Sequence, residues 1–374
     1  MHVLALALLA LVQDDGCRRC EHRGVVPCGR HSEESLEAES RVLFCAFAAA
    51  CEDCRGTLVV DCKRCAGGPG TAEAGARRQA IEAWLPRDEV ERFLGRDLMR
   101  VETERYRLVV ESGPIQDGKK RIDAHVLAHH LADDVEFVAR RLAQDFRLQP
   151  DEYRAKMRMW VWGDPKDHAA VMPEFLHASG PGEFGYLGRD PVLSSWTESP
   201  FFDEAIEVRT LFAHKAGHLL LSNVIRELWI GDLGGGWLDV AVGHSYEYER
   251  FGHTRNYCIE EATVPSNYAG GIWRAAVRAR LEKEPEPFLP RVLKERPGAM
   301  RQEDQALCWS FLDYLRLERA EALRPILADY KAKREPREVL PDRLGASVLE
   351  LEAVWRAWVK DRYPKKGDEL QEAR

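Results

Sequence analysis

The sequence has no long run of lysine or arginine, and it has no apolar run long enough to cross a membrane. Its 54 basic and 62 acidic residues are spread along the chain and leave a formal net charge of -8. Proteins that bind nucleic acid usually carry a basic patch, so nucleic acid is not expected as a partner. The missing apolar run argues against a membrane span.

The most apolar stretch is short and lies at the start of the chain, from Val3 to Val12. A run of this length fits the core of a secretory signal peptide. It departs from the usual pattern because no Lys or Arg precedes it and no small-x-small cleavage motif lies near Gln13. We predict a signal peptide over residues 1–13 and export to the periplasm or the extracellular space. A cytoplasmic protein with an apolar N-terminus is the alternative.

Cysteine is scarce over most of the chain. Eight of the ten cysteines precede residue 66, and only Cys258 and Cys308 follow. A secreted protein stapled by disulfides would tend to distribute its cysteines, so this crowding indicates a local metal-binding or disulfide module. The chain has 374 residues, of which 45% are apolar and 31% charged, and this composition suits a large globular domain beside the small module.

The crowded cysteines follow one spacing rule twice. Each repeat reads C-x2-C-x7-C-x2-[C/H], and histidine takes the last position in the first repeat. A C-x2-C turn directs two sulfurs to one point, which is half of a tetrahedral zinc site, so the repeats predict two zinc ions. Their role is structural, because four protein ligands close each coordination sphere and so short a segment cannot build a sufficient core. The predicted ligands are Cys17, Cys20, Cys28, His31, Cys51, Cys54, Cys62 and Cys65.

The spacing alone leaves the ligand pairing open. Each repeat can close its own site, or the outer half-sites can share one ion and the inner half-sites the other. Disulfides are an alternative in an exported protein. Cys45 falls outside the repeat and is interpreted as a buried thiol. The stretch between the repeats, residues 32–50, is expected to form a helix capped near Ser32.

The segment "CEDCRGTLVVDCKRCAGG" (51–68) resembles the cysteine-rich zinc hairpins of DnaJ-type chaperones. The resemblance implies the nested pairing, with Cys17, Cys20, Cys62 and Cys65 around one ion. The first repeat lacks the glycine that follows such pairs, and no J-domain with a His-Pro-Asp signature is present. The resemblance therefore implies a zinc fold and not a chaperone function.

Hydrophobic periodicity predicts a mixed structure beyond this module. Residues 66–76 are rich in Gly, Pro and Ala and mark a boundary. We expect a cysteine-rich module over 14–70, a helical linker over 71–99, a large domain over 100–363 and a charged tail over 364–374. Strands are predicted at 104–112, 156–164 and within 184–195, and helices at 32–50, 77–84, 87–98, 124–146, 202–224 and 237–252, with a helical C-terminal half. The predicted fold class is α+β.

The stretch "LFAHKAGHLLL" places His214 and His218 four residues apart on a predicted helix, so both imidazoles can reach one ion. A glycine-rich turn and "WLDVAVGHSYEYERFG" (237–252) follow. Together these segments resemble the metal-site helices of gluzincin (peptidase MA-like) peptidases. In that group H-E-x-x-H supplies two zinc ligands and a general base, and a glutamate on the next helix is the third ligand. The resemblance follows the order of elements from about residue 100 to 363 and implies a gluzincin-like domain.

The residues that would perform the chemistry differ from that pattern. Lys215 stands at the general-base position and Val240 at the third-ligand position. Lysine is a cation beside Zn²⁺, and valine cannot ligate a metal. His244, one turn after Val240, could complete a three-histidine site. The sequence therefore predicts no catalytic residue, and a vestigial metal site at His214, His218 and His244.

We expect an exported zinc-binding protein whose peptidase-like domain is inactive and serves as a binding or structural module for an unknown protein or peptide partner. Two zinc ions belong to the N-terminal module, and the large domain adds a third only if the vestigial site still binds. One alternative is an active zinc metallohydrolase that uses His214, His218 and His244 with an unconventional base. Another is a zinc-hairpin adaptor for protein interactions.

Overall fold

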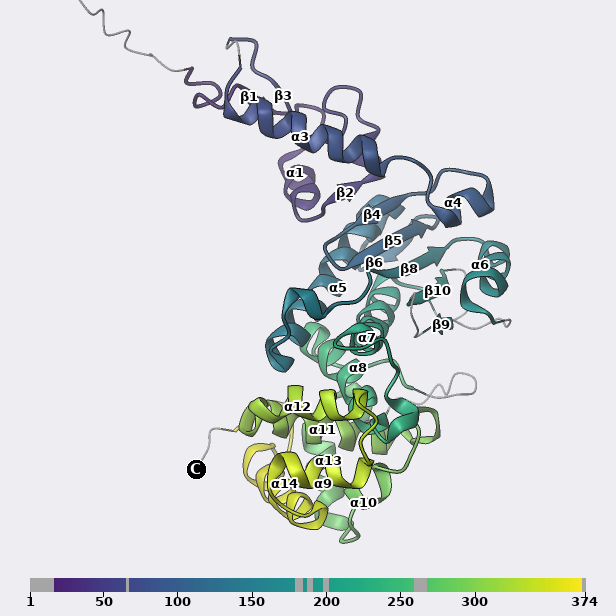
Figure 1. Ribbon diagram of the computed structural model, residues 1–374, viewed down its shortest axis with the longest axis vertical. Coiled ribbons are helices and arrows are strands. Elements are labelled where there is room, and N and C mark those ends of the chain that lie inside the picture. Colours follow the sequence, from purple (N-terminus) through teal and green to yellow (C-terminus); the bar gives the residue numbers. More distant parts are fainter. Residues whose placement is uncertain are drawn as a thin grey trace, which may run out of the picture. The chain divides into compact units, whose positions relative to one another are not determined.

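The computed structural model describes residues 17–64, 67–178, 184–186, 191–197, 202–258 and 268–371, with the backbone alone for 184–186 (Figure 1). The predicted signal peptide and the predicted ligand Cys65 lie outside these residues. The chain divides into two compact units. The first contains the described residues up to Ser40 and then Phe44–Pro86; the second contains Arg41–Leu43 and the described residues from Arg87 onward.

The first unit is built on a small hairpin-like ladder. Strands β1 (Val25–Pro27) and β3 (Val59–Asp61) pair antiparallel, with Val26 opposite Val60. Helix α3 (Pro69–Trp84) lies against the turns of this module: Arg77 donates to the carbonyl of Gly56 at 3.2 Å. The predicted linker is therefore divided, because α3 belongs to the first unit and α4 (Glu89–Leu94) to the second.

The continuous helix predicted for residues 32–50 is interrupted. The Ser32 hydroxyl accepts from the Ser35 backbone N–H at 3.1 Å, as expected of a cap, and α1 covers Glu33–Ser40. The chain then leaves the helix before strand β2 (Phe44–Cys45) and helix α2 (Ala46–Ala49). The Ser40 hydroxyl donates to the Glu37 carbonyl at 2.7 Å, and a β-branched and aromatic stretch follows, which favours extended backbone.

The second unit contains a twisted mixed sheet. Its strands are β4 (Arg100–Glu102), β5 (Tyr106–Glu111), β8 (Met157–Trp162), β10 (Val192–Trp196) and β9 (Phe184–Tyr186), and they lie in that order. The central pairs β5–β8 and β8–β10 are parallel, whereas β4 pairs antiparallel with β5 and β9 pairs antiparallel with β10. Strands β6 (Ile115–Asp117) and β7 (Lys120–Ile122) form a separate hairpin.

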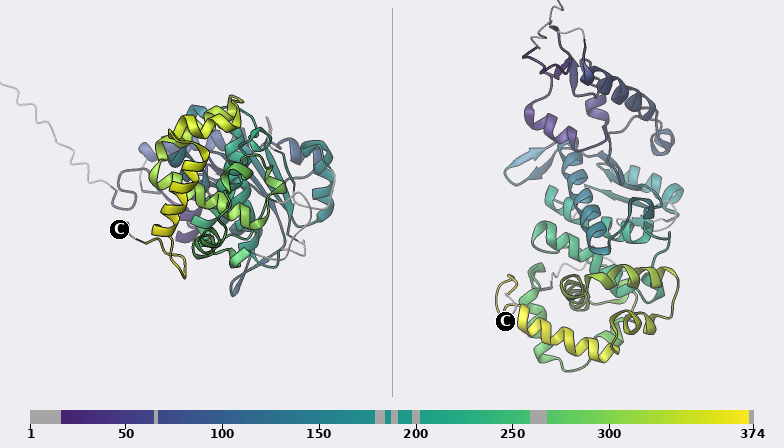
Figure 2. Two further views of the ribbon diagram at one scale, coloured as in Figure 1. Left: turned by 90° about the horizontal axis from the view of Figure 1, so that it is seen from below. Right: turned by 60° about the vertical axis from the view of Figure 1, so that its left-hand side comes forward.

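Helices cover both faces of this sheet. Helix α5 (Ala124–Phe146) begins at the cap Asp123 and lies beside β5 and α7 (Figures 1 and 2). The apolar stripe predicted for this helix is buried. That stripe consists of Leu127, Leu131, Val135, Val138 and Leu142. The other face packs against α4, helix α6 (Pro165–Val171) and the π-helical turn Met172–Leu176, in a cluster that includes Val109, Trp160 and Trp162.

Two neighbouring helices connect the sheet to a helical C-terminal part. Helix α7 (Ala205–Asn223) packs on α5, and α8 (Gly236–Phe251) packs between α7 and α11. The C-terminal helices are α9 (Arg274–Lys283), α10 (Leu289–Val292), α11 (Gln302–Glu318), α12 (Ala320–Lys331), α13 (Pro336–Leu344) and α14 (Val348–Arg362). Short 3-10 turns cover Pro150–Glu152, Gly231–Leu233, Tyr268–Gly271 and Pro297–Ala299. The predicted α+β class with a helical C-terminal half is confirmed.

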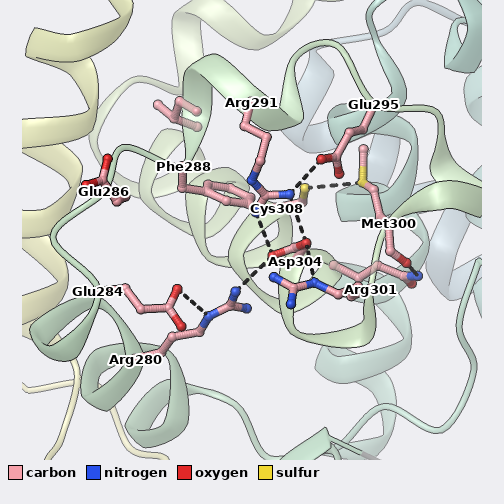
Figure 3. Close-up of polar contacts among 12 residues, drawn as sticks. Arg280, Glu284, Glu286, Phe288, Arg291, Glu295, Met300, Arg301, Asp304 and Cys308 are labelled. Atoms are coloured by element: carbon pink, nitrogen blue, oxygen red, sulfur yellow. Dashed lines mark hydrogen bonds and ion pairs between the residues drawn. The ribbon is translucent and has the colours of Figure 1, made fainter.

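A buried carboxylate ties α9, α10 and α11 together (Figure 3). Asp304, 1% exposed, accepts hydrogen bonds from Arg280 at 3.0 Å, from Arg291 at 2.9 and 3.0 Å and from Arg301 at 3.3 Å. Burial would raise the pKa of Asp304, but these arginines outweigh it and hold the pKa below its usual range.

Among the described residues, no helix combines the length and the apolarity that a membrane span requires.

Candidate metal centres

The inner half-sites of the N-terminal module meet in space. Cys28 Sγ lies 4.0 Å from Cys51 Sγ, and His31 Nε2 lies 3.3 Å from Cys54 Sγ. The four ligand atoms all lie within 4.8 Å of one another. A tetrahedral zinc site has S–S and N–S separations of about 3.8 and 3.6 Å, as follows from the usual bond lengths. These four residues therefore form a group that could bind a metal ion.

The outer half-sites form a second group. Cys17 Sγ lies 3.7 Å from Cys62 Sγ, and Cys20 is the third member within 4.8 Å. Both groups join the first half of one repeat to the second half of the other. Of the two pairings left open by the spacing, this is the nested one.

Local backbone geometry explains why the sulfurs converge. In the first turn the Cys20 N–H donates to the Cys17 carbonyl at 3.2 Å, and the chain then bends at Gly24 with a φ of +78°. A Cβ atom at Gly24 would lie 2.4 Å from the Gly68 nitrogen, so only glycine fits. In the second repeat the corresponding residue Leu58 also has a positive φ, of +66°, and Gly56 has a φ of +86° where the first repeat has His22 at +66°.

The thiols of the module differ in their electrostatics. Burial of Cys51 is outweighed by hydrogen bonds that include those from the backbone N–H groups of Cys54 and Asp53, and its pKa falls to about 6. Such a thiol ionises readily and is suited to ligate a metal. Burial instead raises the pKa of Cys45 to about 12, in accord with the interpretation of a buried thiol. The nine described cysteines form no disulfide with one another.

A further group lies in the second unit, where α7 and α8 approach closely. A Cβ at Gly217 of α7 would lie 3.2 Å from the Cα of Gly243 on α8. The absence of a Cβ at Gly243 leaves room for the two imidazoles of α7, whose Nε2 atoms lie 3.1 Å apart. His214 is fully buried and His218 is 6% exposed. The predicted helical pair therefore does turn both nitrogens toward one point.

Each imidazole meets a different carboxylate of α8 with its other nitrogen. His218 Nδ1 lies 3.1 Å from Asp239 Oδ2, which also accepts from Trp229 Nε1 at 3.1 Å. His214 Nδ1 lies 3.1 Å from Glu247 Oε2. Burial lowers the pKa of His214 well below its usual value. For His218 burial is outweighed, first by Asp239 and then by Cys258, and its pKa rises to about 10.

The third atom at this point belongs to a residue that the sequence did not single out as a ligand. Cys258 Sγ lies 3.4 Å from His214 Nε2 and 3.2 Å from His218 Nε2. Cys258 follows α8 on an irregular segment, so no helical spacing links it to the histidines. The available signal was its position as one of two cysteines outside the N-terminal module.

The other predicted positions lie around this group. Val240 is fully buried in α8, and Lys215 lines a cavity beside His218. His244 packs on His214, but its Nε2 lies 2.9 Å from Gln305 Oε1, and its Nδ1 faces Glu247 at 3.9 Å. Burial lowers the pKa of His244 to about 3. His244 thus groups with His214 and Glu247 on the opposite side of the His214 ring from Cys258.

Comparisons with known proteins add no family. No protein-family model matches the chain, and no curated protein matches it. The functional argument therefore depends on the geometry of the clusters.

Proposed function

We propose that this protein is an exported zinc-binding protein in which the N-terminal module holds two structural zinc ions and the large unit is a peptidase-like scaffold without peptidase activity. The observation that carries the zinc assignment is the convergence of Cys28, His31, Cys51 and Cys54, whose separations fit the edges of a tetrahedral site. Thiolate and imidazole ligands in a tetrahedral arrangement favour zinc over harder cations such as Mg²⁺ or Ca²⁺.

In this proposal the two ions take the place of a core. The module buries few large side chains, and the chain between its ligands contains turns, a three-residue ladder and the short helices α1 and α2. A metal that binds only the folded form stabilises it by its binding free energy. Cys65, by the spacing of the repeat, is proposed as the fourth ligand of the outer ion.

Zinc content of paired variants tests this assignment. In the nested arrangement Cys17→Ser with Cys62→Ser removes ligands of one ion, whereas Cys17→Ser with Cys28→Ser removes ligands of both. Mass spectrometry of metals in the full chain should show one equivalent lost from the first double variant and two from the second. The reverse result would mean that each repeat closes its own site. No loss from either variant would sink the zinc assignment.

The second half of the proposal concerns the large unit. Its support is a sheet packed beside two antiparallel helices, with histidines of α7 turned to α8, and with Lys215 where a gluzincin carries its glutamate base. The His244–Gln305 hydrogen bond makes a three-histidine hydrolase the weaker alternative. We propose that this unit binds a protein or peptide partner or has a structural role. A panel of peptide substrates tests it, and zinc-dependent cleavage would contradict it.

A further inference from the structure

The spacing of three side-chain atoms in the second unit resembles that of ligands around one ion. The separations among His214 Nε2, His218 Nε2 and Cys258 Sγ are 3.1, 3.4 and 3.2 Å. Zinc–nitrogen bonds of 2.0–2.1 Å and zinc–sulfur bonds of 2.3 Å give tetrahedral edges of about 3.3 and 3.6 Å. The observed triangle is thus only slightly smaller than the one that a bound zinc ion would require.

The carboxylates determine which ring nitrogens are free to ligate. Because Asp239 and Glu247 face the Nδ1 atoms, the Nε2 atoms of His214 and His218 are the ones left for a metal ion. A bound cation would take the place of any proton shared among these two nitrogens and the sulfur. A carboxylate behind each ligating histidine is also the usual arrangement in zinc proteins.

The chain that carries Cys258 is held in place by buried polar groups. Gln305, fully buried on α11, accepts from the Cys258 N–H at 3.0 Å, and its amide donates to the Cys258 carbonyl at 3.4 Å. Glu247 Oε1 accepts from the Arg255 N–H and from Asn256 Nδ2, both at 2.7 Å. The carboxylate that orients His214 therefore also anchors the segment leading to Cys258.

A small cavity adjoins this triangle. It has a volume of about 150 Å³, and His218 and Cys258 line it together with Lys215, Trp229 and Pro297. On the other side, a Cβ at Gly243 would lie 2.6 Å from His218 Nε2, so the space beside the nitrogens exists because this residue is glycine.

We propose that His214, His218 and Cys258 bind one zinc ion whose fourth coordination position opens on this cavity and takes water or a small anion. Three protein ligands with an exchangeable fourth distinguish this site from the closed sites of the N-terminal module. Two neutral imidazoles and one thiolate leave a net positive charge on the ion. Lys215 adds a second positive charge and Asp239, which also lines the cavity, offsets one, so the net charge stays positive and favours an anion over a cation. The proposal goes beyond the proposed function and does not depend on the N-terminal ions.

The same atoms contain a second arrangement, in which Cys258, His218 and Asp239 act as a thiol–imidazole–carboxylate series. The position of His214 favours the metal. His214 Nε2 lies 3.1 Å from His218 Nε2 and 3.4 Å from Cys258 Sγ, which are separations expected of ligands around one ion. A thiol–imidazole pair requires only one imidazole beside the sulfur. The two chemistries differ in metal content and in the reactivity of the Cys258 thiol.

Metal analysis of the full chain tests the site. Cys258→Ala and His218→Ala should each lose one zinc equivalent relative to wild type, and Cys308→Ala, which removes another buried thiol of the same unit, should lose none. Cys258→Asp keeps a ligand of similar size and should retain the metal. When the proteins are loaded with cobalt, wild type should show a thiolate-to-metal absorption from Cys258 that Cys258→Ala lacks. Cys258→Asp should lack this absorption too, although it retains the metal. Melting curves establish that each variant is folded.

The measured quantity is the difference in zinc content between each variant and wild type. The ions of the N-terminal module contribute equally to both proteins and do not affect this difference. Full retention of metal by Cys258→Ala and His218→Ala would overturn the proposal, and so would an equal loss from Cys308→Ala. The proposal would also be overturned if the wild-type protein contained no zinc at this site and its Cys258 reacted rapidly with iodoacetamide. That result would support the thiol–imidazole series instead.

Discussion

His214 Nδ1 lies 3.1 Å from Glu247 Oε2, and both side chains are fully buried. The other oxygen of this carboxylate accepts from the segment that leads to Cys258. One acidic group, whose pKa burial raises to about 8, therefore contacts an imidazole on α7 and anchors the chain after α8. This double role makes Glu247 the most informative position for substitution.

Glu247→Gln should weaken zinc binding at the second-unit site by about 10–100-fold, the usual effect of losing a hydrogen-bond partner behind a ligating histidine. The amide can still accept from Arg255, but its N–H₂ group cannot accept from His214 Nδ1. Competition with a chromophoric chelator measures the affinity. Glu249→Gln, on the same helix and in ion pairs with Arg141 and Arg316, is the matched control. An equal effect of both changes would contradict the role given to Glu247.

Gly243→Ala should remove the second-unit zinc without removing a ligand. The new Cβ would lie 2.6 Å from His218 Nε2 and 3.0 Å from His214 Cε1, so the rings must move. Overpacking of this kind costs about 1–3 kcal/mol of folding stability. Metal content and urea unfolding measure the two effects. Gly113→Ala, where nothing lies within 4 Å of the added atom, should change neither.

The unmodified chain should show no zinc-dependent peptide cleavage. General-base catalysis typically contributes about 10²–10⁴-fold, and Lys215 cannot supply it as a cation. Lys215→Glu introduces a carboxylate beside the site, so we expect it to hydrolyse an activated ester faster than Lys215→Gln. Fluorogenic peptides and esters report the rates. Peptide cleavage by wild type that His218→Ala abolishes would show the unit to be an active hydrolase.

Asp304→Asn should destabilise the second unit by about 1.5–3 kcal/mol near pH 7, because Arg280 loses its buried counter-charge whereas the more exposed Arg291 and Arg301 stay hydrated. The pKa of Asp304 is lower in the folded state than its usual value. Its stabilising contribution is therefore complete above the unfolded value of about 3.9 and is lost as the pH falls through the folded value. Urea unfolding should show the variant and wild type converging in strong acid.

Glu303→Gln provides the control for this change on the same turn of α11. Its effect should stay within about 0.5 kcal/mol, as expected away from buried networks. A pH-independent difference between Asp304→Asn and wild type would show that the carboxylate charge is not what stabilises the cluster in Figure 3.

Zinc removal by a chelator should unfold the N-terminal module and leave the second unit folded. In the proposed arrangement the module is stabilised mainly by its ions, whereas the second unit buries a large core on its sheet and helices. Limited proteolysis followed by mass spectrometry should place new cleavages within residues 17–86. An unchanged cleavage pattern after verified loss of zinc would argue that the module folds without metal.

The elements with strong periodicity could be predicted from sequence. The helix predicted at 124–146 is observed over Ala124–Phe146, since its apolar stripe repeats without interruption. The helix predicted at 32–50 breaks after Ser40, because composition alone did not reveal the change to extended backbone. Helix α12 was not predicted from the sequence, and its interior Pro325 weakens the local signal.

The groups of residues that could bind a metal show the same limit of sequence-based prediction. The spacing rule identified the cysteines of the N-terminal module, because a C-x2-C turn is a local feature. The helical interval identified His214 and His218 for the same reason. Cys258 is brought to these histidines by the path of the chain after α8 and by its hydrogen bond to Gln305. Neither feature can be recognised from the spacing of residues in the sequence. His244 satisfied the spacing, but the same tertiary packing directs its Nε2 to Gln305.

The ladder between β1 and β3 has a consequence for how the module loads its ions. It joins Val25–Pro27, which separates Cys20 from Cys28, to Val59–Asp61, which separates Cys54 from Cys62. The inner ligands are joined by the shorter stretch of chain, so their closure loses less entropy. Once that ion aligns the ladder, the outer sulfurs already face each other. Zinc uptake should thus be sequential, and the inner ion should serve as the template on which the outer one is captured.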